Sequence, residues 1–173
     1  MRIADIDRGL PFHYSPTVST DGPAHHHSAS PEETIALGAR IGVRIAGNCA
    51  DGALVLLVGP LGAGKTVLAK GIARGLGIEE QIISPTYTIV SEYGSGSVPL
   101  HHVDLYRIEG TEQMENLGLE DIVRGNGIVV VEWGEKLAPS LVSAATDREP
   151  RIRVTIALAP DGGRDITVED IKE

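Results

Sequence analysis

The chain has 173 residues and a formal net charge of −9, which argues against a broad electrostatic grip on DNA or RNA. Its single cysteine, Cys49, excludes an internal disulfide, and its length favours one domain. No apolar run reaches the roughly 18 residues that a membrane helix requires, and no apolar signal-peptide core is visible. We therefore expect a cytoplasmic protein without a membrane anchor.

Residues 1–29 differ in composition from the rest of the chain. They contain Pro11, Pro16 and Pro23 and show no lasting hydrophobic periodicity, which predicts a flexible N-terminal arm. Three adjacent histidines, 25–27, are either metal ligands or part of a solvated segment. The second interpretation is favoured because no cysteine or carboxylate cluster accompanies them. The ordered domain is predicted to span residues 30–173.

A first helix is predicted to begin after Ser30. Ser30 suits the N-cap, Pro31 the first helical position, and Glu33 closes a capping box. Apolar residues then recur at helical spacing, at Ile35, Leu37, Ile41 and Ile45.

Residues 53–66 carry the strongest signal in the chain. Six apolar residues, 53–58, predict a buried central strand, and the next eight, Gly-Pro-Leu-Gly-Ala-Gly-Lys-Thr, match the phosphate-binding loop pattern G-x-x-x-x-G-K-[ST]. A helix is predicted over 65–76. Glycines let successive N–H groups point at phosphate oxygens, while Lys65 reaches the β- and γ-phosphates and Thr66 ligates Mg²⁺. The pattern predicts a nucleoside triphosphate site.

A hydroxyl-rich segment, Ser84-Pro-Thr-Tyr-Thr88, follows that helix. Ser84, Thr86, Tyr87 and Thr88 are either a switch that senses the γ-phosphate or an ordinary turn before a strand. Residue types alone leave both interpretations open.

Two acids end predicted strands downstream. Glu132 follows four apolar residues, 128–131, and Asp104 follows a more polar strand that begins near residue 97. Ligand sites in open α/β sheets lie at this edge, so we expect Glu132 to be the principal Mg²⁺ ligand and Asp104 to order or activate water. The alternatives are a solvent-facing acid for Glu132 and a turn cap for Asp104. Trp133, the only tryptophan, should report on the site.

The remaining pattern predicts a helix over 111–123, a polar link over 138–150, and a hairpin of strands 151–158 and 164–168 around Asp161-Gly-Gly. Arg148, Arg151 and Arg153 form either an RNA contact or a solvated strand face. Together the elements predict an α/β, P-loop NTPase-type three-layer fold with a mainly parallel central sheet and a C-terminal antiparallel hairpin.

Four motifs in this order resemble the bacterial TsaE family, formerly called YjeE, over about residues 30–170. They are the phosphate loop, Ser-Pro-Thr-Tyr-Thr-Ile-Val, His-Val-Asp-Leu-Tyr-Arg and Val-Glu-Trp-Gly-Glu-Lys. The resemblance implies an ATPase required for threonylcarbamoyladenosine modification of tRNA. It implies that the protein acts on the TsaB–TsaD heterodimer and meets tRNA only through that complex.

Carried onto this chain, the resemblance assigns ATP and Mg²⁺ as cofactors. The phosphates would contact the loop and first helical turn, and Thr66 and Glu132 would hold Mg²⁺. Lys65, Asp104 and Glu132 would be catalytic, and Ser84 to Thr88 would form a switch. Thr34, Gly163 and Arg164 would flank the adenine. The loop residues concerned are Gly59, Gly62, Ala63, Gly64, Lys65, Thr66 and Val67.

Two other functions share such a loop. One is a small-molecule kinase, although about 140 residues leave little room for an acceptor site and a lid. The other is a nucleotide-dependent binding switch, although the Asn-Lys-x-Asp signature that reads guanine is absent.

Overall fold

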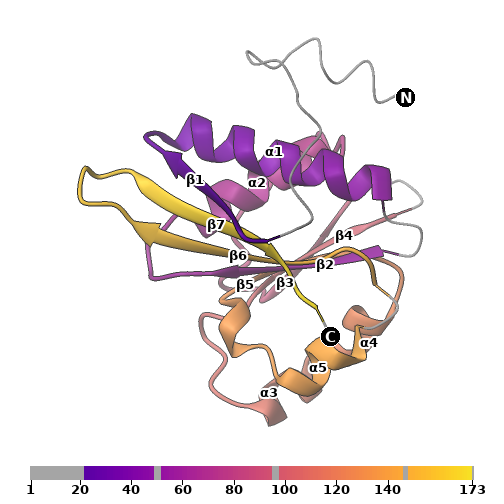
Figure 1. The fold of residues 1–173 in the computed structure, drawn as a ribbon. Helices are drawn as coiled ribbons and strands as arrows, with labels where there is room; N and C mark the ends of the chain where they lie inside the picture. The colour runs from indigo at the N-terminus through magenta and orange to yellow at the C-terminus, as the bar shows by residue number, and fades with distance from the viewer. Residues whose placement is uncertain (1–21, 49–51, 95–97, 146–147, 173) are drawn as a thin grey trace.

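The computed structural model describes residues 22–48, 52–94, 98–145 and 148–172. They form a mixed seven-stranded sheet in the order β1-β7-β6-β2-β5-β4-β3. The four central strands β6, β2, β5 and β4 are parallel, and β7, β1 and β3 are antiparallel to their neighbours. Helices cover both faces, α1 and α2 on one side and α3, α4 and α5 on the other (Figure 1). The predicted α/β fold with a parallel core and a C-terminal hairpin is confirmed.

The elements have the following bounds in chain order. They are β1 (Ala24–Ser28), α1 (Pro31–Asn48), β2 (Gly52–Val58), α2 (Lys65–Gly75), β3 (Val90–Tyr93), β4 (Leu100–Asp104), α3 (Thr111–Asn116), α4 (Leu119–Arg124), β5 (Gly127–Glu132), a 3₁₀ turn η2 (Gly134–Lys136), α5 (Pro139–Ala144), β6 (Arg151–Leu158) and β7 (Arg164–Asp170).

The central strand β2 feeds two cores because side chains alternate across a sheet. Ala53, Val55 and Leu57 pack under α1 and α2, while Leu54 and Leu56 face the layer of short helices. The apolar run in the sequence of β2 is unbroken because both faces of this strand are buried. None of the helices within the described residues is long and apolar enough to cross a membrane.

The predicted arm over residues 1–29 is wrong for its last part. Residues 24–28 form β1, which pairs with β7 in register His26↔Ile166. A strand ladder uses backbone N–H and C=O groups, so a polar, histidine-rich segment can join the sheet at its edge without an apolar pattern. The ordered domain therefore begins before residue 30. Residues 1–21 and Cys49 lie outside the described residues.

Two other expectations are corrected. The predicted helix over 111–123 divides into α3 and α4 at Gly118, whose φ of 64° leaves the right-handed helical region. The predicted polar link over 138–150 contains α5. The start of α1 is confirmed: the Glu33 N–H donates to Ser30 Oγ at 3.2 Å, although the Glu33 carboxylate accepts from the N–H of Ala29 rather than Ser30.

The three arginines 148, 151 and 153 do not share a surface. Arg148 and Arg151 are buried, and only Arg153 is exposed. The Arg148 guanidinium donates to main-chain carbonyls at the ends of β2, α4 and β5, including Ile122 O at 2.9 Å and Gly127 O. Both interpretations made from the sequence, an RNA contact and a solvated strand face, are therefore wrong for Arg148 and Arg151.

Helices α1 and α2 touch backbone to backbone. Gly38 and Gly42 on α1 face Gly71 and Gly75 on α2, and a Cβ built on Gly71 would lie 2.3 Å from the Ile35 carbonyl oxygen. A side chain at such a position would force the two helices apart. This contact fixes α2, and with it the phosphate loop that precedes it, against the domain.

We expect Gly71→Ala to lower the free energy of unfolding by about 1–3 kcal/mol because the added methyl group overpacks the crossing. Gly47→Ala is the matched control: Gly47 also lies in a helix of this pair but meets no atom within 4 Å. That change should be neutral or stabilising by up to about 1 kcal/mol through helix propensity. Urea unfolding of both variants measures the difference, and equal stabilities would contradict the close crossing.

Candidate nucleotide and metal site

The phosphate loop joins β2 to α2. At several positions in it, only glycine, which has no Cβ, fits easily. Gly62 and Gly64 have φ values of 76° and 104°. A Cβ on Gly59, whose φ is 150°, would come within 2.4 Å of the Ile156 carbonyl oxygen. The loop closes on itself by a 3.2 Å bond from Ala63 N–H to Pro60 O. The result is a tight curve that ends at the N-terminus of α2, where helix N–H groups favour an anion.

Lys65 is held inside this curve. Its Nζ donates to Gly59 O at 2.6 Å and Pro60 O at 2.9 Å, and lies 3.8 Å from the centre of the Trp133 ring. Only 5% of the residue is exposed, and this burial lowers the pKa of Lys65, while the negative charge of Glu132 opposes the lowering. A cation is thus fixed beside the loop with carbonyls as its partners.

Thr66 and Glu132 join the first turn of α2 to the end of β5. The Thr66 hydroxyl lies 2.8 Å and 3.0 Å from the two carboxylate oxygens of Glu132. Because a carboxylate only accepts, the hydroxyl hydrogen points to it and the lone pairs of Thr66 are left for a cation. Glu132 is 3% exposed, so the solvent-facing alternative is wrong.

A hydroxyl and a carboxylate are the oxygen ligands that suit Mg²⁺, which keeps most of its waters and takes few protein ligands. No group of three or more His, Cys, Asp or Glu side chains poised for a metal is found where the structure describes the chain, the histidines 25–27 included. The donors present therefore fit Mg²⁺ shared with phosphate and water, and do not fit a metal caged by protein alone.

Asp104 lies next to Glu132 in register on the neighbouring strand. Its Oδ2 accepts from Ser84 Oγ at 3.0 Å and from Thr86 Oγ1 at 2.7 Å. Its Oδ1 caps the following turn through a 2.9 Å bond from Tyr106 N–H. One carboxylate thus caps a turn and also anchors the hydroxyl-rich segment at the sheet edge.

Of the hydroxyl-rich segment 84–88, only Ser84 and Thr86 contact Asp104. Tyr87 is 84% exposed with the Arg107 guanidinium 4.4 Å from the centre of its ring, and the Thr88 hydroxyl lies 3.4 Å from Ser91 Oγ. Residues 84–88 make a turn before β3, as one interpretation predicted. Ser84 and Thr86 nonetheless line the same pocket as the loop.

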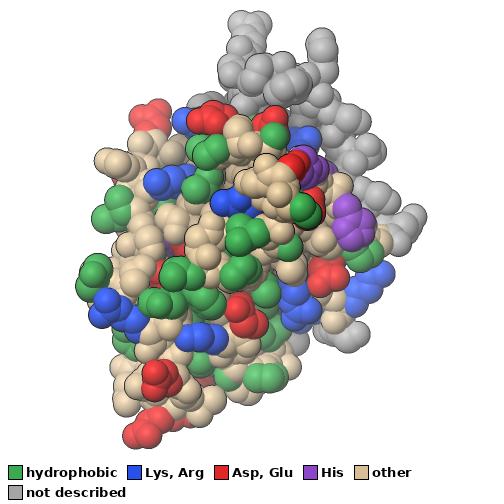
Figure 2. Space-filling view, turned by 90° about the vertical axis from the view of Figure 1, so that its left-hand side faces the viewer, with side chains coloured by type: hydrophobic (Ala, Val, Ile, Leu, Met, Phe, Trp, Pro, Cys, Tyr) green, Lys and Arg blue, Asp and Glu red, His purple; other side chains and the backbone are tan. Residues whose placement is uncertain are grey.

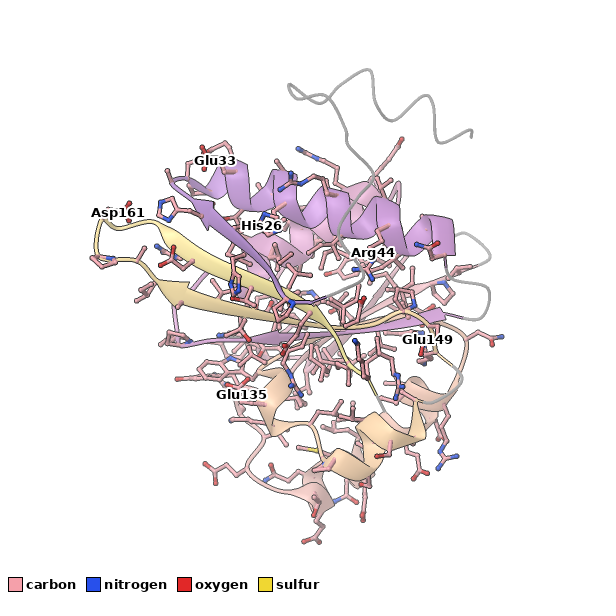
Figure 3. All side chains as sticks on the ribbon, viewed as in Figure 1. His26, Glu33, Arg44, Glu135, Glu149 and Asp161 are labelled. Atoms are coloured by element: carbon pink, nitrogen blue, oxygen red, sulfur yellow. The ribbon has the colours of Figure 1, made fainter. Side chains whose placement is uncertain are left out.

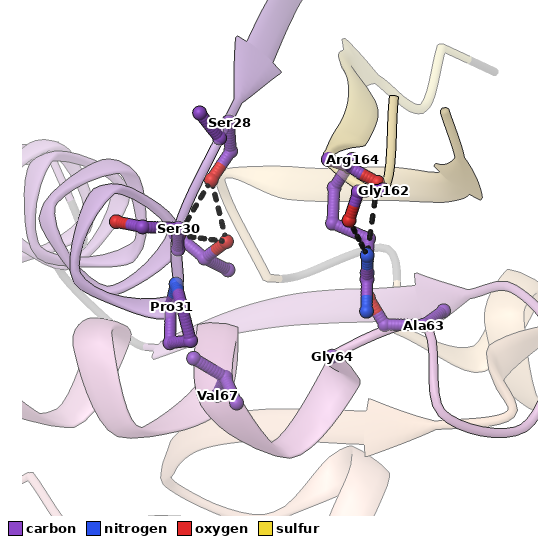
Figure 4. Close-up of a pocket in the computed structure, with 11 residues that line it drawn as sticks. Ser28, Ser30, Pro31, Ala63, Gly64, Val67, Gly162 and Arg164 are labelled. Carbon is purple, nitrogen blue, oxygen red and sulfur yellow. Dashed lines mark hydrogen bonds between the residues drawn. The ribbon is translucent and has the colours of Figure 1, made fainter. Parts of the chain in front are cut away.

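Two adjacent pockets follow the loop. The larger, of about 340 Å³, is lined by residues of the loop and the two acids together with Tyr106 and Trp133. The smaller, of about 120 Å³, brings together Thr34, Gly163 and Arg164, which are far apart in the sequence. Figure 4 shows Arg164 beside Ala63 of the loop in the lining of this pocket. Ala63, Gly64 and Val67 line both pockets.

The hairpin wall of the smaller pocket is tied to the loop. Arg164 donates from Nε to Ala63 O at 2.8 Å and from Nη2 to Gly62 O at 3.3 Å. Behind it, His27 of β1 reaches Asp165 at 2.9 Å and Asp161 at 3.1 Å, and Asp161 sits at the hairpin tip (Figure 3). The edge strand that the sequence did not reveal therefore supports one wall of the site.

Comparison with known proteins fits this arrangement. The family model described as threonylcarbamoyl adenosine biosynthesis protein TsaE matches residues 28–166. The chain belongs to the TsaE family.

Individual relatives agree. The chain is 42% identical over 132 residues to the tRNA threonylcarbamoyladenosine biosynthesis protein TsaE of Treponema pallidum, which covers 75% of this chain and 91% of that protein. It is 39% identical over 140 residues to the Bacillus subtilis TsaE, covering 81% of each. The crystal structure of Bacillus subtilis YdiB superposes with a TM-score of 0.64 at 32% identity over 89% of this chain and 90% of that one.

The roles of His102 and Tyr106 are not predicted by the sequence pattern. Both flank Asp104 in the motif His-Val-Asp-Leu-Tyr-Arg, and His102 shares a strand face with Asp104 because they are two residues apart. The two-residue spacing between His102 and Asp104 is therefore the sequence feature that indicates that His102 lies near the site. Tyr106 packs on Trp133 with ring centres 5.3 Å apart, a contact that sequence distance conceals.

We expect Lys65→Ala to abolish nucleotide binding, because the loop loses the cation that would face the phosphates. Trp133 fluorescence should change saturably with ATP in the wild type, since the Trp133 ring lies 3.8 Å from Lys65 Nζ and lines the same pocket. The variant should show no saturable change. Lys70→Ala, an exposed lysine on the same helix, is the control and should bind normally. Unchanged ATP affinity in Lys65→Ala would contradict the assignment.

His27 should make stability depend on pH. The hydrogen bond to Asp165 and the charge of Asp161 raise the pKa of His27 above its ordinary value of 6.5. This stabilisation is complete below that value and is lost as the pH rises through the higher pKa of the folded protein. The denaturation midpoint of the wild type should exceed that of His27→Gln in mild acid and converge with it in alkali. His25→Gln loses a hydrogen bond to Thr167 but keeps His27, so its denaturation midpoint should retain the pH dependence of the wild type. Parallel pH profiles for the wild type and His27→Gln would refute the link.

Proposed function

We propose that this protein is a Mg²⁺-dependent ATPase that serves threonylcarbamoyladenosine modification of tRNA. The observation that carries the proposal is the Thr66–Glu132 contact, which places a hydroxyl and a carboxylate beside a phosphate loop. Family membership supports the role in tRNA modification, and the residues of the site support Mg²⁺-dependent ATP hydrolysis.

Each residue has a distinct task. The loop N–H groups and Lys65 hold the phosphates, and Thr66 and Glu132 hold the metal directly or through its water. Bound Mg²⁺ supplies neutralisation of phosphate charge. Asp104 orients or deprotonates the attacking water with one oxygen fixed by Ser84 and Thr86, so a change in that segment alters the acid as well. The turn formed by residues 84–88 thereby acts as a switch.

The smaller pocket suits the adenine. It is continuous with the phosphate loop through three shared residues and has Thr34, Gly163 and Arg164 in its lining. A Cβ on Gly163 would lie 2.8 Å from Ser28 O, so this wall approaches β1 closely. Space beside the loop supports a bound base, and membership of the TsaE family supports adenine as that base.

A protein partner is supported by the surface around the larger pocket. Four large apolar side chains of the loop and the adjoining segments are exposed: Leu61, Ile83, Tyr87 and Tyr106. Figure 2 views the side of the molecule where the hairpin tip lies, and Lys and Arg are interspersed there with Asp and Glu. Such a face suits protein contact better than an RNA backbone. We propose the TsaB–TsaD heterodimer as the partner, tRNA contact through that complex only, and a cytoplasmic location.

The test is ATP hydrolysis by the purified protein, alone and with TsaB–TsaD added. We expect a slow intrinsic rate that rises with the heterodimer, since partners can supply charge stabilisation worth about 10³ to 10⁵ in rate. GTP should be used poorly. Equal use of GTP, or no response to the heterodimer, would overturn the proposal. ADP formation that requires an added small acceptor would indicate a kinase.

Replacing Glu132 should separate ATP binding from ATP hydrolysis. We expect Glu132→Ala to retain part of its ATP affinity, because the loop and Lys65 remain, but to lose Mg²⁺-dependent hydrolysis. Glu115→Ala, which removes an exposed carboxylate on α3, should hydrolyse ATP normally. Full Mg²⁺-dependent turnover by Glu132→Ala would transfer the metal role to Asp104.

A further inference from the structure

His102 is buried against the proposed metal ligand. It lies on β4, is 1% exposed, and its Nε2 is 2.9 Å from Glu132 Oε1. Its other ring nitrogen, Nδ1, is buried without a hydrogen-bond partner among the described residues. Burying an imidazole is costly unless its nitrogens are bonded, so packing alone would be better served by an apolar side chain.

The contact distinguishes the two oxygens of Glu132. A carboxylate has no hydrogen to give, so His102 Nε2 carries the hydrogen and donates it to Oε1. Oε1 also lies 2.8 Å from the Thr66 hydroxyl, whereas Oε2 has, among the described residues, only that same hydroxyl as a partner, at 3.0 Å. The single hydroxyl hydrogen cannot serve both oxygens fully. Oε2 is therefore the oxygen with accepting capacity to spare.

We propose that His102 is a positioning residue that fixes Glu132 Oε1, so that Oε2 is presented to the metal or to a water on it. The inference rests on the proposed function, because it assumes that Glu132 serves a metal. Hydrogen-bond donors behind a ligand fix its orientation, and their loss typically lowers metal affinity or activity by about 10- to 100-fold.

His101 provides a matched control on the same strand. Successive side chains point to opposite faces, and His101 faces away from Glu132 toward Glu92 at 3.7 Å. Replacing it removes a histidine from β4 without touching the site.

The experiment compares His102→Leu, His102→Gln and His101→Leu after thermal unfolding shows that each is folded. Leu removes the donor, whereas Gln can place an amide N–H near the position of Nε2. Two quantities are measured: ATP affinity in EDTA, and the Mg²⁺ concentration that half-maximally strengthens ATP binding. Neither requires turnover, so the result stands apart from a failure of ATPase activity. If His102→Leu does not fold, His102→Met takes its place.

We expect His102→Leu to raise the Mg²⁺ concentration that half-maximally strengthens ATP binding about 10- to 100-fold, with ATP affinity in EDTA unchanged. In His102→Gln this Mg²⁺ concentration should return most of the way to the wild-type value. His101→Leu should match the wild type. Wild-type Mg²⁺ dependence in His102→Leu would overturn the proposal. So would equal impairment of the Gln and Leu variants, because that indicates packing rather than donation. ATP binding that ignores Mg²⁺ in the wild type would instead refute the metal role of Glu132 and with it the proposed function.

Discussion

The hydrogen bond between Thr66 and Glu132 joins the two parts on which the site depends. Thr66 is in the first turn of α2, and Glu132 is the last residue of β5. The bond exists only because β2 and β5 are neighbouring parallel strands whose carboxyl ends reach the same edge. The close glycine crossing of α1 over α2 holds the other end of this contact, since α2 cannot move outward without separating the two helix backbones.

Four cationic side chains among the described residues donate to main-chain carbonyls. Lys65 and Arg164 do so within the phosphate loop, Lys136 bonds the carbonyls of Tyr106 and Ile108, and Arg148 bonds those at the far ends of the central strands. Irregular backbone leaves carbonyls without ladder partners, and a long side chain with several donors can reach them. The charges of Lys65 and Arg164 thereby also gather around the loop, where an anion is expected.

The antiparallel edge completes the pocket that the parallel core begins. The core supplies the loop and both acids, whereas β7 and β1 build the wall beside Ala63 and Gly64. His27 holds this wall together through two carboxylates of the hairpin. A segment with no apolar pattern thus contributes to the site because sheet pairing depends on backbone groups.

Elements whose signals are local can be predicted from the amino-acid sequence. The loop pattern, the capped start of α1, the apolar runs of β2 and β5, and the Asp-Gly-Gly hairpin turn depend on neighbours within a few residues, and each is present in the structure. The order of four motifs was also sufficient for the family. Of the candidate site, the loop residues and the two acids were found because strand ends in such folds meet at one edge.

Features that depend on partners distant in the sequence become visible once the chain is folded. The histidines 25–27 became a strand because β7 offered a free edge, and Arg148 and Arg151 became buried because carbonyls and packing around them come from other elements. His102 acquired a partner in Glu132, 30 residues away, that no local pattern could predict. A polar side chain that is solvated cannot be distinguished by sequence from one that is paired inside the fold. Its burial becomes favourable only when the folded chain supplies a hydrogen-bonding or charged partner.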